Sequence, residues 1–191
     1  MPRPRSDSKD RILASARTLF RRHGYQGTGL AQVIEHSGAP RGSVYFLFPG
    51  GKEEMAVATV TEWARELRQF IRHHRRECAT AREWISTMAN HFAEELRASG
   101  FLEGLPLTTI ALDSVPRSTA LTVACRAAYD GWVAELGDGL RAHGTPATQA
   151  RSLAELMLAT LEGAVLLCRV AQSTEPIDRI LPHILAAVEN A

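Results

Sequence analysis

The segment from residue 24 to residue 55 constrains the fold of this chain more than any other part of the sequence. It contains two short runs in which apolar residues recur at helical spacing, joined by the turn sequence Ser-Gly-Ala-Pro at residues 37–40. Gly38 permits the backbone conformation that ends a helix, and Pro40 suits the first turn of the helix that follows. Thr28 is expected to cap the first of the two helices. The segment therefore predicts a helix-turn-helix.

The second of these short helices has two chemically different sides. Val44 and Phe48 form an apolar side, whereas Arg41, Ser43 and Tyr45 make the other side basic and rich in hydroxyl groups. A short helix of this kind fits the major groove of duplex DNA, where the base edges offer hydrogen-bonding groups. The residues predicted to contact DNA are Thr28, Arg41, Gly42, Ser43, Tyr45, Phe46 and Lys52.

The residues within this second helix have different expected roles. Arg41 and Ser43 can each bind a base edge or a phosphate, and Gly42 lets the helix come close to the DNA backbone. The Tyr45 hydroxyl suits a phosphate, with a place in the core as the alternative for this aromatic ring. Phe46 is expected either to touch a thymine methyl group or to pack inward.

Basic charge is concentrated in the first part of the chain. Residues 1–76 contain 14 Lys and Arg against 7 Asp and Glu, whereas residues 77–191 contain 8 against 14. A basic part joined to an acidic part is expected when only the first of them meets phosphate. Thr28 and Lys52, each expected at a helix N-terminus, are natural phosphate partners.

The segment resembles the DNA-binding part of the TetR family of bacterial transcriptional regulators. The matching positions are Gly24, Tyr25, Thr28, Val33, Gly38, Ala39, Arg41 to Tyr45, Phe48, Lys52 and Glu53. The Gly-Gly-Lys sequence at residues 50–52 resembles the variant in regulators similar to the lincomycin-resistance repressor. Pro40 stands where the family usually has a capping Ser or Thr, which would remove a phosphate contact. Leu47 replaces a commonly polar residue, which would remove a DNA contact.

The rest of the sequence predicts helices and no strands. The predicted helices cover residues 8–22, 52–76, 79–99, 104–112, 117–143, 146–172 and 177–190. Together with the two short helices they make an all-α fold of nine helices, which the resemblance also implies. We expect a three-helix DNA-binding domain at residues 1–51 and a larger helical effector-binding and dimerisation domain at residues 52–191.

Neither a signal peptide nor a membrane span is predicted. The N-terminus has no apolar run after its basic residues, and no uninterrupted apolar stretch reaches the roughly 18 residues of a membrane helix. A cytoplasmic protein without a membrane partner is therefore expected. The three cysteines are widely spaced, so reduced thiols are expected, with a redox-sensing pair as the alternative.

The sequence indicates no enzyme, cofactor or metal site. There is no nucleophile elbow and no phosphate-binding loop between a strand and a helix. His73 with Glu77, and His74 with Cys78, have the four-residue spacing that metals tolerate on a helix. Arginines surround these pairs, however, and no third ligand is apparent, so we expect no metal.

The larger domain is expected to hold an effector. Trp84, Met88, His91 and Phe92 share one face of a helix, and further aromatic and polar residues lie on the helices that follow. A flat, mostly apolar ligand would fit a pocket between them, with His91 or Tyr129 fixing its orientation. The alternative is a filled core with a satisfied histidine. The predicted ligand-binding residues are Trp84, Met88, His91, Phe92, Phe101, Thr109, Cys125, Tyr129 and Trp132.

The last two helices are expected to form a homodimer. Both carry apolar stripes that are wider than one intramolecular contact requires, although both stripes serving the monomer core is the alternative. Pro182 is expected to kink the final helix. The predicted interface residues are Leu153, Met157, Leu161, Ala164, Val165, Ile177, Ile180, Leu181, Ile184 and Val188.

These features predict a ligand-responsive transcriptional regulator. The expected protein is a repressor that binds a palindromic DNA operator as a dimer. In the family that the segment resembles, a small effector reshapes the body and releases the DNA, as a shift between DNA-competent and DNA-incompetent states. The alternative is a DNA-binding regulator or activator that has no small-molecule effector.

Overall fold

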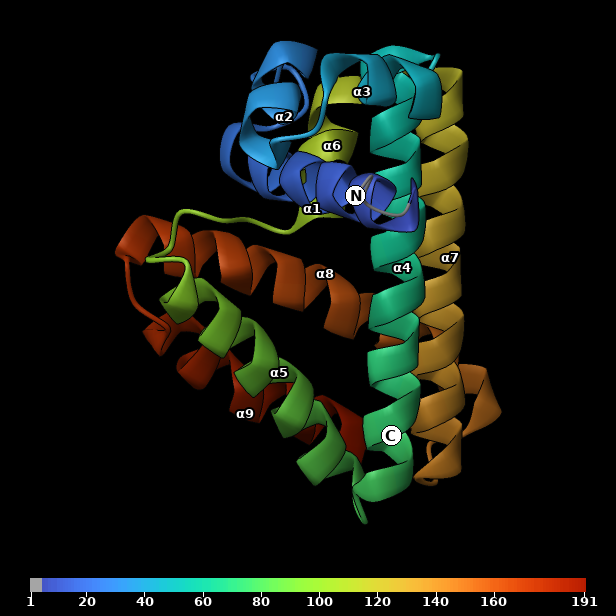
Figure 1. Ribbon diagram of the computed structural model, residues 1–191. Coiled ribbons are helices and arrows are strands. Elements are labelled where there is room, and N and C mark those ends of the chain that lie inside the picture. The colour runs from blue at the N-terminus through green and yellow to red at the C-terminus, as the bar shows by residue number, and fades with distance from the viewer. Residues whose placement is uncertain (1–4) are drawn as a thin grey trace. The chain divides into compact units, whose positions relative to one another are not determined.

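The computed structural model describes residues 5–191, with side chains from residue 8 onward (Figure 1). This part of the chain is all-α, and it contains no strand. The helices are α1 (Arg5–His23), α2 (Leu30–Ser37), α3 (Arg41–Leu47), α4 (Gly51–Glu77), α5 (Ala81–Ala98), α6 (Pro106–Ser114), α7 (Thr119–Ala142), α8 (Ala147–Ala171) and α9 (Glu175–Glu189). The nine helices predicted from the sequence are confirmed for the described residues.

One predicted helix cap is wrong. Gly29, and not Thr28, is the N-cap residue of α2, and its backbone N–H donates to Oε1 of Gln32 at 2.6 Å. The Thr28 hydroxyl instead donates to the carbonyl oxygen of Gly24 at 2.8 Å, which closes the loop between α1 and α2. The Gln32 side chain thus supplies, from inside the helix, the acceptor for the N-cap N–H, which is the bond that a Gln at this position makes in a capping box.

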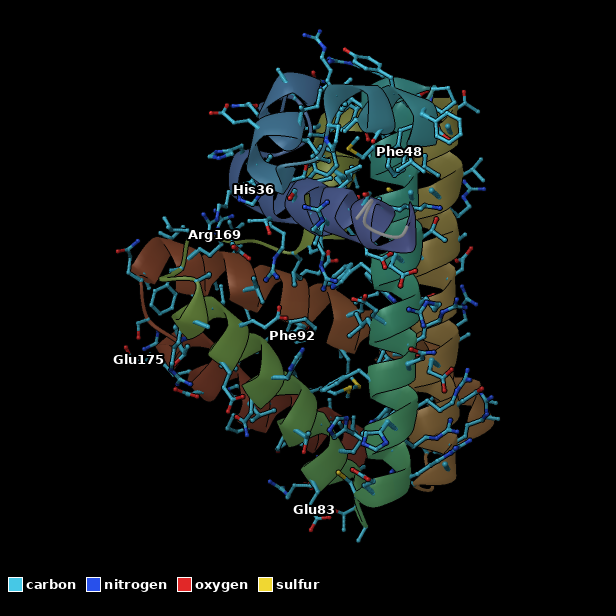
Figure 2. All side chains as sticks on the ribbon, viewed as in Figure 1. His36, Phe48, Glu83, Phe92, Arg169 and Glu175 are labelled. Carbon is cyan, nitrogen blue, oxygen red and sulfur yellow. The ribbon has the colours of Figure 1, made fainter. Side chains whose placement is uncertain are left out.

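Helix α5 begins with a reciprocal cap that its sequence encodes. The Thr80 hydroxyl accepts a hydrogen bond from the backbone N–H of Glu83 at 3.1 Å. The carboxylate of Glu83, which Figure 2 labels at this end of α5, accepts one from the N–H of Ala79 at 2.9 Å. Two N–H groups that have no helical partner are thereby satisfied.

The helices group into two compact units. Unit 1 contains the described residues up to Trp63 together with Leu105–Ala128, and unit 2 contains Ala64–Gly104 and Tyr129–Ala191. Helices α4 and α7 therefore each contribute their first part to unit 1 and their second part to unit 2.

The core of unit 1 forms where α1 packs against α2, α3 and α6. Ile12, Phe20, Val33 and Val44 have no exposed surface in this core, nor has Ile110 of α6. Helix α6 lies outside the predicted DNA-binding segment of residues 1–51, yet it is part of the same compact unit. Burial of these apolar side chains is the main stabilising contribution to the unit.

Two long-range hydrogen bonds attach α6 to the end of α1 and the loop that follows. The backbone N–H of Gln26 donates to Oδ2 of Asp113 at 2.9 Å, and the hydroxyl of Thr109 donates to the carbonyl oxygen of Phe20 at 3.1 Å. The Gln26 N–H and the Phe20 carbonyl oxygen are both backbone groups. The two hydrogen bonds therefore fix the main chain next to the helix-turn-helix.

The core of unit 2 forms where α5, α8 and α9 pack on one another. Figure 2 shows Phe92 of α5 on the side that faces α8, and its side chain is buried. The second part of α7 contributes Leu136 and Leu140 to the same core. No helix in the described part of the chain is both long and apolar enough to cross a membrane.

Candidate functional site

Hydrogen bonds between neighbouring residues stabilise the turn between α2 and α3. Gly38 ends α2 in the left-handed region with φ of 60°, and its N–H donates to the carbonyl oxygen of Glu35 at 3.2 Å. The hydroxyl of Ser37 accepts a hydrogen bond from the N–H of Ala39 at 3.2 Å. Pro40 then precedes α3 without any side-chain cap, and its carbonyl oxygen accepts the first helical hydrogen bond, from Ser43 N at 2.9 Å.

Helix α3 turns its apolar side inward and a mixed basic and aromatic side outward. Val44 and Phe48 are buried, whereas Arg41 and Gly42 are exposed and Ser43 is half-buried.

The two aromatic residues of α3 also lie on the outside. Tyr45 is 46% exposed and Phe46 is 69% exposed, so neither the core position considered for Tyr45 nor the inward packing considered for Phe46 occurs. The guanidinium group of Arg41 lies over the Tyr45 ring at 5.7 Å from the centroid, and its Nη2 lies 3.5 Å from the Tyr45 hydroxyl. The two side chains thus form one exposed cationic and aromatic surface on α3.

Lys52 is held beside this helix by a residue that the sequence-based site prediction missed. Its ammonium group donates to the carbonyl oxygen of Tyr25 at 3.1 Å and lies 4.3 Å from the centroid of the Tyr25 ring. Burial, and then the nearby carboxylate of Glu53, raise the pKa of the Tyr25 hydroxyl. Tyr25 is one of the positions that match the TetR family pattern, and this match could have identified it as a site residue.

Thr28 does not offer a free hydroxyl to a ligand in this structure. Its side chain is buried, with 1% of its surface exposed, and the hydroxyl donates to the carbonyl oxygen of Gly24. The phosphate contact predicted for Thr28 therefore has no exposed oxygen to form it.

The two tryptophans predicted for the effector pocket are both buried in unit 2. Trp84 has no exposed surface, and its indole N–H donates to the carbonyl oxygen of Ile71 at 3.2 Å. Trp132 is 1% exposed and donates to the carbonyl oxygen of Ala64 at 3.2 Å. Both indole groups are thus satisfied by the protein itself, as a core position requires.

The other predicted ligand residues of α5 also make contacts within unit 2. Met88 and Phe92 are buried. The imidazole ring of His91 is half-buried and stacks on Phe70 with centroids 4.3 Å apart, and its Nε2 lies 3.8 Å from Oε1 of Glu95. His91 thus makes contacts with two residues of its own chain, Phe70 and Glu95.

Three further residues of the predicted pocket are not in α5. Phe101 is half-buried in unit 2 and adopts a positive φ of 60° just after that helix. Thr109 and Cys125 belong to unit 1, where the Thr109 hydroxyl is bonded to Phe20 and Cys125 is buried. Burial raises the pKa of the Cys125 thiol to about 11.

Tyr129, the remaining predicted ligand residue, lines an open groove between α7 and α8. The groove has a volume of about 310 Å³. The Tyr129 hydroxyl donates to Oε1 of Glu162 at 2.7 Å across this groove. The lining residues are Tyr129, Asp130, Val133, Arg151, Glu155, Leu158, Ala159 and Glu162. An aromatic ring, three aliphatic side chains, one guanidinium group and three carboxylates therefore face the same hollow.

The side chains predicted for the dimer interface are all buried or half-buried within the chain. The buried ones are Met157, Ala164, Val165, Ile177 and Val188, and the half-buried ones are Leu153, Leu161, Ile180, Leu181 and Ile184.

Helix α8 has a second apolar side, which is exposed. We call it the α8 stripe, and it consists of Leu156, Gly163, Leu166, Leu167 and Val170. The exposed fractions of its four large side chains run from 49% at Leu156 to 77% at Val170. No atom lies within 4 Å of the position that a Cβ on Gly163 would take. The exposed apolar side chains of α8 are therefore a different set from the residues predicted for the interface.

The chain matches two protein-family models, one for each end. Residues 12–59 match the family model for bacterial regulatory proteins of the tetR family, and residues 81–183 match that for the C-terminal domain of LmrA/YxaF-like transcriptional regulators. The chain is 35% identical to the HTH-type transcriptional regulator LmrA of Bacillus subtilis (strain 168), over 94% of this chain and 97% of LmrA.

Two solved structures are similar in fold. A TetR transcriptional regulator from Legionella pneumophila has a TM-score of 0.85 and 18% identity, over 94% of this chain and 96% of that one. A cysteine mutant of the TetR family regulator CifR, complexed with 26bp double-strand operator DNA, has a TM-score of 0.79 and 21% identity. It covers 93% of this chain and 95% of its own.

Proposed function

The chain belongs to the TetR family of DNA-binding transcriptional regulators, with an LmrA/YxaF-like C-terminal domain, and from this we propose that it is an effector-responsive repressor. It binds a palindromic operator as a homodimer and leaves the operator when a small molecule binds its body. The observation that carries the proposal is the outward face of α3, where Arg41 and Tyr45 form one exposed surface over a buried apolar side.

Helix α3 enters the major groove of the operator in this proposal. Arg41 binds a guanine edge or a phosphate, Ser43 binds a base edge or a phosphate, and the Tyr45 hydroxyl binds a phosphate. Gly42 is exposed, and no atom lies within 4 Å of the position of a Cβ there, so the backbone can come close to DNA. Phe46, whose side chain is 69% exposed, contacts a thymine methyl group in this proposal.

Lys52 provides a phosphate contact at the start of α4. Its ammonium group is already oriented by the carbonyl oxygen and the ring of Tyr25, so little side-chain entropy is lost when a phosphate binds. The N-terminal end of α4 adds the positive end of a helix dipole at the same place.

The working unit is a dimer formed through the α8 stripe. Four large apolar side chains with exposed fractions of 49% to 77% on one helix side are unfavourable in water, and pairing with the same side of a second copy would bury them. The spacing of Leu156, Gly163, Leu167 and Val170 repeats at three, four and seven residues, as in a helix that packs along another. The open space at Gly163 permits a close crossing.

The half-buried residues of α9 extend this surface. Ile180 and Ile184 are apolar side chains that the core of unit 2 covers only in part. Helices α8 and α9 are in direct contact, so the two copies would contribute two helices each to a four-helix bundle. Two α3 helices related by a two-fold axis then match the two half-sites of a palindrome.

In this proposal the effector binds within unit 2, in the groove that Tyr129 lines. Its volume of about 310 Å³ is that of a small-molecule site, and Tyr129, Val133 and Leu158 offer apolar surface. A small, largely aromatic compound would lie against the Tyr129 ring. A hydrogen-bond donor on the compound would replace the Tyr129 hydroxyl at Glu162.

Two experiments test the proposal. Footprinting should show a palindromic site near the promoter of the protein's own gene or of an adjacent transcription unit. A reporter driven by that promoter should become more active when the gene is deleted. A screen of aromatic compounds by thermal melting should find ligands that raise the melting temperature and also release operator DNA. A regulator without an effector would bind the same operator and gain no stability from any compound in the screen.

A further inference from the structure

The last two turns of α4 bring three metal-ligating groups together. A ring nitrogen of His73, a ring nitrogen of His74 and a carboxylate oxygen of Glu77 all lie within 4.8 Å of one another. Nε2 of His73 is 3.2 Å from Oε2 of Glu77, one helical turn further along. The two imidazole rings approach edge to face, with centroids 4.9 Å apart. The third ligand that was not apparent from the four-residue spacing is therefore present.

His74 is oriented by a backbone group in a way that leaves one nitrogen available. Its Nδ1 lies 3.0 Å from the carbonyl oxygen of Phe70. A carbonyl oxygen can only accept a hydrogen bond, so Nδ1 carries the hydrogen and a neutral ring keeps the lone pair on Nε2. The Phe70 ring, 4.2 Å away between centroids, restricts the imidazole further. A hydrogen bond from the second ring nitrogen to a carbonyl is what orients histidine ligands in metal sites.

Two of the three neighbouring arginines, Arg72 and Arg75 but not Arg76, are less unfavourable to a cation than the sequence suggests. Arg72 and Arg75 both lie against the buried carboxylate of Glu135, at 2.6 Å and 3.5 Å. The hydrogen bond and the charge of Glu135 also raise the pKa of Arg72. Part of the positive charge is thus balanced inside unit 2, and the C-terminal end of α4 contributes the negative end of its helix dipole.

We propose that His73, His74 and Glu77 form a binding site for a divalent first-row transition metal of the Zn²⁺ class. Two imidazoles and one carboxylate are a ligand set that Zn²⁺ accepts, with a fourth position left for water. Any donor pair near the 4.8 Å limit must move closer, because two ligand bonds of roughly 2.0–2.2 Å to one ion cannot span that distance. The side chains of His73 and Glu77 are 62% and 59% exposed, so they are free of packing that would prevent this movement.

Titration of the full chain with ZnCl₂ tests the site. The protein is freed of any affinity tag and stripped with a chelator, and Zn²⁺ binding is followed by calorimetry in competition with a chromophoric chelator. One saturable site per chain is expected. His73→Ala, His74→Ala and Glu77→Gln should each weaken it by about tenfold or more, because each removes one ligand.

Two matched variants separate this site from other metal-binding groups. His183→Ala removes an exposed histidine of α9, and Cys78→Ser removes the half-buried thiol that follows α4, and both should keep the affinity of the original protein. Circular dichroism checks that each variant is helical. The proposal is overturned if the original protein shows no saturable binding in the micromolar range, or if His73→Ala and His74→Ala bind Zn²⁺ as tightly as it does. Loss of the site in Cys78→Ser alone would also overturn it. None of these results depends on the operator or on an effector.

Discussion

The indole ring of Trp84 lies directly on Gly139: a Cβ on Gly139 would lie 2.1 Å from Cη2 of Trp84. Trp84 is completely buried and Gly139 is inside α7, where glycine is unfavourable for a helix. The close approach of the ring is therefore the reason that this helix has glycine at this position. It also gives Trp84 a packing role in unit 2.

Gly139→Ala should destabilise the protein by about 1–3 kcal/mol, because the added methyl group overpacks the Trp84 site. Gly137→Ala is the control on the same helix, since its nearest neighbour, the carbonyl oxygen of Ala150, lies at an ordinary 3.7 Å. That variant should be neutral or more stable by up to about 1 kcal/mol, from helix propensity. Denaturant unfolding followed by circular dichroism measures both. Equal stability of the two variants would contradict the assigned contact.

Arg41→Ala should weaken operator binding by about 1–3 kcal/mol and relax specificity at the base pair that Arg41 contacts. Tyr45→Phe should weaken binding through loss of a phosphate contact, with no change in specificity. Arg179→Ala removes one exposed positive charge from α9, outside α3, and serves as the control. Gel shifts on the operator and on single-base variants provide the measurement. The assignment of α3 fails if Arg41→Ala and Arg179→Ala bind alike.

Lys52→Gln should weaken binding to the operator and to unrelated DNA by a similar factor, because a phosphate contact carries no sequence information. The slope of log affinity against log salt concentration should fall in magnitude by about one. Tyr25→Phe keeps the carbonyl oxygen and the ring that hold Lys52, so its affinity should stay close to that of the original protein. An unchanged salt slope in Lys52→Gln would show that this ammonium group makes no phosphate contact.

Leu166→Glu should dissociate the dimer while leaving the subunit folded, because the side chain is 59% exposed within the subunit. Val165→Asp, its neighbour in sequence, should unfold unit 2, because that side chain is buried and a charge there has no partner. Val123→Glu alters an exposed apolar residue of unit 1 and should affect neither property. Sedimentation gives the mass and circular dichroism the helix content. A dimeric Leu166→Glu variant would rule out the α8 stripe as the interface.

Cys125 should not react with a thiol reagent in the folded protein at pH 8, because its pKa is raised to about 11 and its side chain is buried. The raised pKa means that the folded state holds the thiol proton more tightly than the unfolded state does. Its contribution to stability is therefore fully present below the ordinary pKa of 9.0 and is lost as the pH rises toward about 11. Timed labelling followed by mass spectrometry should modify Cys78 first. Rapid labelling of Cys125 would contradict its burial.

Local patterns in the sequence determined the helices and the helix-turn-helix. Apolar spacing, the glycine at residue 38 and the cap residues at Thr80 and Glu83 act over a few residues, so they can be read without knowledge of the fold. The exposed positions of Arg41 and Gly42 follow in the same way, since Val44 and Phe48 specify the buried side of α3. The cap at Thr28 was wrong because the N-cap of α2 is one residue later, at Gly29, and the Thr28 hydroxyl donates to the carbonyl oxygen of Gly24 instead.

Only the tertiary structure decided which apolar side of α8 faces the core. Both sides carry large aliphatic residues, and periodicity alone cannot choose between Val165 and Leu166. The attachment of α6 to the loop after α1 depends on Asp113 and Gln26, which are 87 residues apart, and no local rule relates them. The pairing of Arg72 with Glu135 likewise joins residues 63 positions apart. Contacts of this kind form only when packing brings distant segments together, because their free energy depends on burial and geometry that the linear pattern does not contain.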